Sequence, residues 1–207
     1  MMAGEGDREE EELRVKVLLL GEPGAGKTSL RDRLCQHYFN PFWVKTVGVQ
    51  FSRRKFLAPL DDQLQRFHVC FWDMGGDQPH CEAIAPFYKN AMAIVYVFDL
   101  TNMESLRGLP EWKKRAGEFC NGKKVVTILV GTKRDLKYLR EVGEEAAKEM
   151  GQRLGADHYA EVSALEERGG VEEAMVELFT SVSHEFRFGI KRPIRLTKEP
   201  TYYRSCI

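Results

Sequence analysis

The fold of this chain is decided by the stretch Gly21-Glu22-Pro23-Gly24-Ala25-Gly26-Lys27-Thr28, which has the form G-x-x-x-x-G-K-[ST]. An apolar run precedes the stretch, and Leu30 and Leu34 lie one helical turn apart just after it. In this strand–loop–helix setting, small residues let backbone N–H groups surround a phosphate, and the helix N-terminus adds partial positive charge. The alternative is a glycine-rich turn that only caps a helix. The pattern predicts phosphate binding by Gly21, Pro23, Gly24, Ala25, Gly26, Lys27, Thr28 and Ser29.

Buried strands are indicated on both sides of this loop. Continuous apolar runs occur at 15–20, 91–98 and 125–130, with a weaker run at 158–162. Runs of this length suit parallel strands that are covered on both faces. Apolar residues also recur every three or four positions from 139 to 154 and from 171 to 186, as in amphipathic helices. Strands that alternate with such helices predict an α/β fold with helices on both faces of the sheet.

One segment departs from this alternation. Apolar residues alternate with small or polar ones at 47–51 and again at 67–71, and the turn-like stretch 58–62 separates the two. This pattern predicts an antiparallel hairpin at the edge of the sheet. Together with the four apolar runs, this hairpin predicts a mixed, mostly parallel sheet of six strands.

The composition argues against several classes of protein. The 31 basic and 31 acidic residues cancel, so the charge balance gives no reason to expect nucleic-acid binding. No stretch approaches the roughly 20 apolar residues of a membrane span, and the acidic start is unlike a signal or transit peptide. The five cysteines show no paired spacing, which indicates reduced thiols. We therefore expect a cytoplasmic protein that acts as a monomer.

A second motif indicates which base is bound. Residues 132–135, which read T-K-R-D, follow the apolar run 125–130. The carboxylate of Asp135 can accept hydrogen bonds from both the ring N–H and the exocyclic amine of guanine, whereas adenine offers no such pair of donors. A mismatched base leaves this carboxylate unpaired, at a cost of several kcal/mol. In isolation a solvated turn is an equal alternative, but residues 161–164, E-V-S-A, supply a second element of the site.

These two segments resemble the N-K-x-D and E-T-S-A motifs of GTP-binding proteins. Thr132 stands where that family usually has asparagine, whose amide braces the phosphate loop, and Leu165 stands where it usually has lysine. The resemblance implies that the base is bound by Thr132, Lys133, Asp135, Ser163, Ala164 and Leu165.

The segment at 37–51 resembles the first switch of Ras-superfamily small GTPases, and its part at 45–51, K-T-V-G-V-Q-F, is similar to the T-I-G-V-D-F of the Rab branch. The match implies that Thr46 ligates Mg²⁺ beside Thr28 and senses the γ-phosphate. Phe39 would lie edge-on to the guanine, and Trp43 would close over the phosphates. Simple core packing is the alternative for both aromatic residues.

Residues 72–78, W-D-M-G-G-D-Q, resemble the second-switch motif W-D-T-A-G-Q-E. The resemblance implies that Asp73 holds Mg²⁺ through a water, that the Gly76 N–H contacts the γ-phosphate, and that Lys27 reaches the outer two phosphates. It covers about residues 13 to 187, and it implies a P-loop GTPase domain there. An acidic disordered arm at 1–12 and a basic irregular tail at 188–207 would flank this domain.

Asp77 occupies the position of the family's catalytic glutamine, which orients the attacking water. Aspartate is shorter, cannot donate a hydrogen bond when ionised, and adds negative charge near the γ-phosphate. We therefore predict slow intrinsic hydrolysis. Gln78 would substitute only if the loop slips by one position. The catalytic candidates are Lys27, Gly76, Asp77 and Gln78.

The end of the chain lacks a standard lipid anchor. A C-a-a-X box needs cysteine fourth from the end, where Arg204 stands, and Rab-type tails usually carry two cysteines where this tail has Cys206 alone. The tail is basic, so two interpretations stay open: a solvated tail, and weak peripheral contact with a membrane.

The sequence therefore predicts a Rab-like small GTPase, a switch in vesicle or intracellular transport that binds GTP or GDP with Mg²⁺. Its partners would be effector, exchange and activating proteins that contact the two switch segments. One alternative is a guanine-nucleotide-binding adaptor that does not hydrolyse GTP. Another is an adenine-specific P-loop ATPase or kinase.

Overall fold

A computed structural model of the chain describes residues 13–42, 44–60, 63–75, 85–120 and 124–187. Its single sheet has the strand order β2-β3-β1-β4-β5-β6. The strands are β1 (Leu13–Leu20), β2 (Val49–Leu60), β3 (Gln63–Met74), β4 (Ala93–Asp99), β5 (Val126–Thr132) and β6 (His158–Glu161). The helices are α1 (Lys27–Gln36), α2 (Ala85–Tyr88), α3 (Met103–Arg107), α4 (Leu109–Phe119), α5 (Glu144–Leu154) and α6 (Val171–Arg187), with a short 3₁₀ helix, η2, at Lys137–Leu139.

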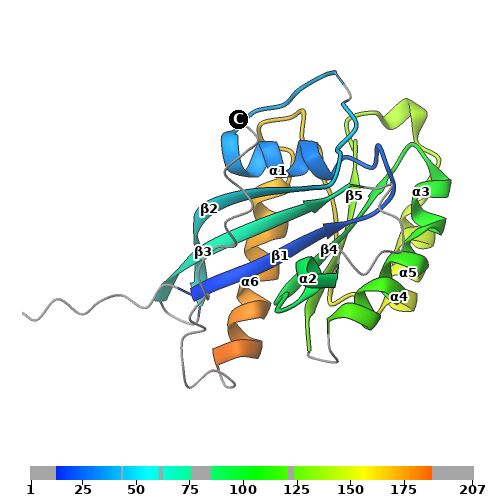
Figure 1. Cartoon of the computed structure of the whole chain (residues 1–207). Coiled ribbons are helices and arrows are strands. Elements are labelled where there is room, and N and C mark those ends of the chain that lie inside the picture. The colour runs from blue at the N-terminus through cyan, green and yellow to red at the C-terminus, as the bar shows by residue number, and fades with distance from the viewer. Residues whose placement is uncertain (1–12, 43, 61–62, 76–84, 121–123, 188–207) are drawn as a thin grey trace, which may run out of the picture.

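The strand pairing confirms the predicted mixed sheet. Strands β2 and β3 pair antiparallel as the expected hairpin, and Phe51 lies opposite Trp72 in their register. The other pairs, β1 with β3, β1 with β4, β4 with β5, and β5 with β6, are all parallel. The carboxyl ends of β1, β3, β4, β5 and β6 therefore lie at one edge of the sheet, where the loops that follow them meet (Figure 1).

Helices cover both faces of the sheet because the apolar side chains of its strands point both ways. On β1, Val15, Val17 and Leu19 join a cluster with α1 and α6. Leu18 and Leu20 join a second cluster with α2, α3, α4 and α5. This arrangement accounts for the continuous apolar runs in the sequence, because each such strand is buried on both sides.

The helices differ from the sequence expectation in two places. The periodic pattern predicts a helix from Leu139 to Leu154, but α5 begins only at Glu144, so the predicted start is wrong. Val142 lies before α5 in an irregular segment and is buried there, and its backbone N–H donates to the carbonyl of Leu100 at 3.1 Å. Leu139 is exposed. Helices α3 and α4 are not among the helices that the sequence pattern predicts. They follow each other with only Gly108 between them.

Two further expectations concern membranes and thiols. Within the described ranges, no helix is both long enough and apolar enough to cross a membrane. Among the described residues, Cys35, Cys70 and Cys120 form no disulfide. The two predicted tails, Cys81 and Cys206 lie outside the described residues.

Replacing Phe179 with alanine should lower the free energy of unfolding by about 3–5 kcal/mol, because it opens a cavity where α6 meets the hairpin. Phe179 is fully buried, and its ring centroid lies 5.0 Å from that of Phe56 and 5.6 Å from that of Phe67. Denaturant unfolding measures the change. Tyr138→Ala, at a fully exposed side chain, is the control and should cost no more than about 0.5 kcal/mol. Equal effects of the two substitutions would contradict this account of the core.

Candidate functional site

The loop between β1 and α1 is held closely against β4. Gly21 has a φ of 151°, and a Cβ built there would lie 2.1 Å from the carbonyl oxygen of Val97. Gly26, at the N-cap of α1, has a φ of 91° and supplies no side-chain cap. Only glycine fits the first position, and the uncapped end of α1 leaves backbone donors for another acceptor. These are the properties that the sequence predicted for a phosphate loop.

Lys27 lies inside the curve of this loop. Its ammonium Nζ donates to the carbonyl oxygens of Gly21 at 2.8 Å and Glu22 at 2.9 Å. The side chain is only 5% exposed. A buried ammonium at this point places a fixed positive charge at the centre of the loop, beside the N-terminus of α1.

Three predicted metal-binding residues from distant parts of the chain meet beside this loop. The Thr28 hydroxyl donates to Oδ2 of Asp73 at 2.6 Å, and it lies 2.7 Å from the hydroxyl of Thr46. Asp73 is fully buried near the end of β3. Its other oxygen, Oδ1, is also buried and accepts no hydrogen bond from any described residue. The cluster thus presents hard oxygen atoms, one of them unsatisfied.

Burial raises the pKa of the Asp73 carboxyl, and the Thr28 hydrogen bond and the Arg31 guanidinium oppose that rise. Arg31 Nη1 lies 3.3 Å from Oδ2 of Asp73. An acid whose pKa is higher in the folded state binds protons more tightly there than in the unfolded chain. Stability therefore falls as the pH rises from the ordinary pKa of aspartate through the raised one. A bound cation would offset this cost, because it favours the charged carboxylate.

The residues that the sequence predicts to bind the base form the opposite end of the site. The Ser163 hydroxyl donates to Oδ1 of Asp135 at 2.6 Å, which joins the two predicted base motifs. Arg33 on α1 donates from Nε to the carbonyl of Ala164 at 2.6 Å and from Nη2 to that of Leu165 at 3.0 Å. The loop after β6 is thus held against both the loop after β5 and the helix that follows the phosphate loop.

Thr132 still contacts the phosphate loop although it replaces the asparagine expected there. Its hydroxyl donates to the carbonyl oxygen of Ala25 at 2.7 Å and lies 3.1 Å from that of Phe98. The residue is buried, and its Oγ1 would lie 3.0 Å from a Cβ at Gly26. The brace that an asparagine amide would supply is therefore supplied here by a shorter side chain that lies against glycine.

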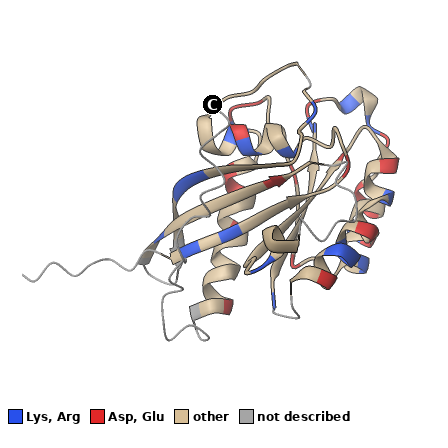
Figure 2. Cartoon of the chain, viewed as in Figure 1, with Lys and Arg blue, Asp and Glu red and all other residues tan. Residues whose placement is uncertain are grey.

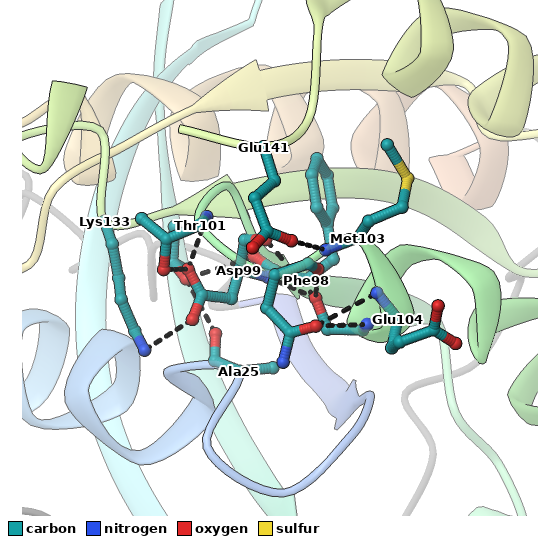
Figure 3. A network of polar contacts seen from close by, with 11 residues as sticks. Ala25, Phe98, Asp99, Thr101, Met103, Glu104, Lys133 and Glu141 are labelled. Atoms are coloured by element: carbon teal, nitrogen blue, oxygen red, sulfur yellow. Dashed lines mark hydrogen bonds and ion pairs between the residues drawn. The ribbon is translucent and has the colours of Figure 1, made fainter. Parts of the chain in front are cut away.

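Asp99, at the end of β4, fixes the lysine of the base motif. Lys133 Nζ lies 2.6 Å from Oδ2 of Asp99, and both the N–H and the hydroxyl of Thr101 donate to Oδ1 at 2.8 and 2.7 Å (Figure 3). Lys133 itself has a positive φ of 61°. The ion pair therefore holds Lys133 in place although its backbone conformation is an uncommon one for a residue with a side chain.

A hollow of about 440 Å³ joins the two ends of the site. The predicted residues that line it are Pro23, Gly24, Gly26, Lys27, Thr28, Ser29, Phe39, Thr46, Thr132, Lys133, Asp135, Ala164 and Leu165. Four predicted residues do not line the hollow but form hydrogen bonds with residues that do: Gly21, Ala25, Asp73 and Ser163. Trp43, Gly76, Asp77 and Gln78 lie outside the described residues.

Sequence reasoning missed several residues that position the site. Besides Arg31, Arg33 and Asp99, the Glu22 carboxylate accepts a hydrogen bond from Nε1 of Trp112 on α4 at 2.9 Å. Glu22 lies within the loop motif at a position where the motif allows any residue. None of these partners has a sequence signal of its own, because each is identified only by its contact across the fold.

Comparison with known proteins gives a single family. The model of the Ras family matches residues 16–184. Human "Ras-related protein Rab-30" is 32% identical over 172 residues, which is 83% of this chain and 81% of that protein. "Ras-related protein Rab11B" of Nicotiana tabacum is 30% identical over 81% of this chain and 74% of its own length. "Ras-related protein RABA1c" of Arabidopsis thaliana is 30% identical over 88% of this chain and 82% of its own length.

Thr132→Val should lower the free energy of unfolding by about 1–3 kcal/mol, because it keeps the shape of the side chain but leaves the buried carbonyl of Ala25 without its donor. Thr132→Ser, which keeps the hydroxyl and loses one methyl group, should cost about 1 kcal/mol or less. Denaturant unfolding of both variants measures the difference. If valine is tolerated as well as serine, the hydrogen bond to Ala25 does not brace the loop.

Proposed function

Because the chain belongs to the Ras family and is a Rab-like small GTPase, we propose that it binds GTP and GDP with Mg²⁺ in the hollow described above. There it would act as a nucleotide-dependent switch in vesicle transport. The observation that carries the proposal is the meeting of Lys27, Thr28, Thr46 and Asp73 at one end of the hollow with Asp135 at the other. A nucleotide needs both ends: cations and N–H donors for its phosphates, and a carboxylate for its base.

The metal would be held by Thr28, Thr46 and Asp73. All three offer oxygen, the ligand atom that Mg²⁺ prefers. The buried Oδ1 of Asp73 lacks a hydrogen-bond donor among the described residues, which supports the presence of a cation or its bound water nearby. When bound, Mg²⁺ neutralises charge on the phosphate oxygens.

The remaining residues would orient the nucleotide. Lys27, at the centre of the loop, would reach the outer phosphates, and the N-terminus of α1 would add backbone donors. Asp135, held by Ser163, would accept from guanine and so exclude adenine. Phe39 also lines the hollow, and it would contact the ring of the base. An adenine-specific ATPase or kinase would leave the Asp135 carboxylate without its two donors.

Thr46 is the element that would make the site a switch. It belongs to the segment between α1 and β2, yet its hydroxyl contacts Thr28 at 2.7 Å. A γ-phosphate and Mg²⁺ would hold this segment in place, and hydrolysis would end those contacts. The same reasoning applies to the segment after β3, where Gly76 is expected to contact the γ-phosphate.

Effectors would bind an aromatic row beside these segments. The rings of Phe51 and Trp72 pack edge to face at 5.0 Å, and Phe87 lies 5.7 Å from Trp72. Phe51 is 40% exposed. Aromatic residues on an exposed surface are typical anchors of protein interfaces. Because β2, β3 and α2 flank the two switch segments, a partner that binds the row would also sense their positions.

Intrinsic hydrolysis would be slow, because Asp77 cannot orient the attacking water as glutamine does. An activating protein would then supply the missing groups in trans. The family relationship gives no support to the alternative of an adaptor that never hydrolyses GTP. Exchange and effector proteins would control the lifetime of the GTP-bound state in either case.

Asp73→Asn should accelerate the release of GDP in the presence of Mg²⁺ by about 10- to 100-fold, the cost typical of removing a residue that supports a metal ligand. Asparagine keeps the shape but removes the charge. Release of a fluorescent GDP analogue, with and without Mg²⁺, measures the effect. Glu104→Gln, at an exposed carboxylate on α3, is the control and should release GDP at the wild-type rate. A variant whose GDP release still responds to Mg²⁺ like wild type would refute the role of Asp73.

Asp77→Gln should raise the rate of single-turnover GTP hydrolysis about tenfold or more, equivalent to about 1.4 kcal/mol of transition-state stabilisation. Gln78→Ala should leave the wild-type rate unchanged. A wild-type rate as fast as that of ordinary relatives would show that hydrolysis is not slow. A rate that falls in Gln78→Ala would instead identify Gln78 as the residue that replaces the missing glutamine.

A further inference from the structure

The outer half of the sheet carries a concentrated positive charge on one face. The side chains of β1, β2 and β3 that point away from α1 and α6 include five basic residues, which we call the basic face: Arg14, Lys16, Arg53, Lys55 and Arg66. Lys16 is half-buried, and the other four are exposed. Figure 2 shows Lys and Arg on β1 and on the hairpin.

The strand registers place these residues side by side. Arg14 and Lys55 both lie opposite His68, and Lys16 and Arg53 both lie opposite Cys70. Among the described residues that share this face, none is acidic. The whole chain has 31 acidic and 31 basic residues, so it carries as much negative as positive charge.

Six of these acidic residues lie directly before β1. Residues 5–12 read E-G-D-R-E-E-E-E, with six carboxylates against Arg8 alone. This segment joins the sheet at Leu13, the first residue of β1 and the neighbour of Arg14. We propose that residues 5–12 dock on the basic face of their own chain, so that the acidic segment is an intramolecular ligand of this surface.

The segment is long enough to reach the whole basic face. An extended chain spans about 3.3 Å or slightly more per residue, so eight residues reach about 27 Å. Neighbouring strands lie about 4.8 Å apart, so crossing from β1 over β3 to β2 takes about 10 Å. The first acidic residues back from Leu13 would meet Arg14, and the more distant ones would reach Lys55 and Arg53.

Several weak contacts and the tether together carry the association. A single exposed ion pair contributes only about 0–1 kcal/mol. The covalent link, however, holds the carboxylates at an effective concentration in the millimolar range. Such contacts are screened by salt, since the Debye length falls from about 10 Å at 0.1 M to about 3 Å at 1 M. The docked segment should therefore leave the face at high salt.

Lys16 connects the basic face to the aromatic row. Its Nζ donates to the carbonyl of Lys89 at 2.8 Å and lies 4.6 Å from the ring centroid of Trp72. Burial lowers the pKa of Lys16 to about 8, so the three arginines and Lys55 carry most of the charge above that pH. The basic face thus borders the aromatic row at Trp72, and an anionic membrane would compete with the docked segment for the same charges.

The proposal can be tested on the full chain by changing Glu9, Glu10, Glu11 and Glu12 together to Gln. At low salt, NMR resonances of Arg53, Lys55 and Arg66 should differ between this variant and wild type. The differences should vanish at about 1 M salt, where the charges are screened. GDP binding should not change, because no altered residue lies in the hollow, and this also distinguishes the test from that of the proposed function.

Charge reversals on the surface supply matched controls. In the background of the double variant Arg53→Glu and Lys55→Glu, the same four Glu→Gln substitutions should no longer shift the resonances of Arg66. Lys114→Glu, at an exposed residue of α4, should leave the spectral differences intact. The proposal would be overturned if the Glu→Gln variant and wild type gave the same spectra, or if their differences mapped to another surface. It would also be overturned if the differences persisted in the double variant.

A second experiment distinguishes the segment from other occupants. A chain that lacks residues 1–12 should bind phosphatidylserine vesicles at least about threefold more tightly than the full chain, because the removed segment competes for the same charges. Equal binding by the two chains would show that the segment does not cover the basic face, and would overturn the proposal.

Discussion

The site is organised around the buried carboxylate of Asp73. Burying a charge is costly unless opposite charge or hydrogen bonds compensate it. Here Thr28 and Arg31 on α1 approach Oδ2, while Oδ1 is left without a donor among the described residues. This partial compensation ties α1, the segment that contains Thr46, and the end of β3 to one point. It also leaves the carboxylate suited to a cation, so the constraint that shapes the local fold would also favour the proposed metal.

The topology of the sheet brings the other groups to that point. In a parallel sheet the loops that follow the strands gather at the carboxyl edge, which is where ligands bind in such folds. The loop after β1 supplies Lys27, the end of β5 supplies Thr132, and the loop after β6 supplies Ser163. Close packing then fixes their distances: Gly21 has no room for a Cβ beside Val97, and Thr132 lies against Gly26. The geometry therefore depends on small residues as much as on reactive ones.

The sequence could predict those parts of the fold and site that local pattern or motif spacing encodes. The apolar runs predicted β1, β4, β5 and β6, and alternation predicted the β2–β3 hairpin, because burial on one or both faces leaves a direct trace in the sequence. The extent of α5 could not be predicted, since Val142 is buried by a backbone contact with Leu100 rather than by a helix. Arg33, Asp99 and Trp112 were missed for a related reason: each acts through contacts with residues far away in the chain. Where Thr132 replaces asparagine, only the structure shows that its hydroxyl reaches Ala25.

Strand β3 relates the nucleotide site to the outer surface of the sheet. Trp72 and Asp73 are neighbours in the chain, so the alternation of a strand directs them to opposite faces. Asp73 points toward Thr28 and Arg31, while Trp72 lies between Phe51 and Phe87 in the aromatic row. A backbone shift at the end of β3 that alters the contacts of Asp73 must therefore also move Trp72. Because Lys16 lies over the Trp72 ring, the same shift reaches the edge of the basic face. One strand would thus give the chain a physical path by which the proposed partners on its outer surface sense what is bound at the carboxyl edge.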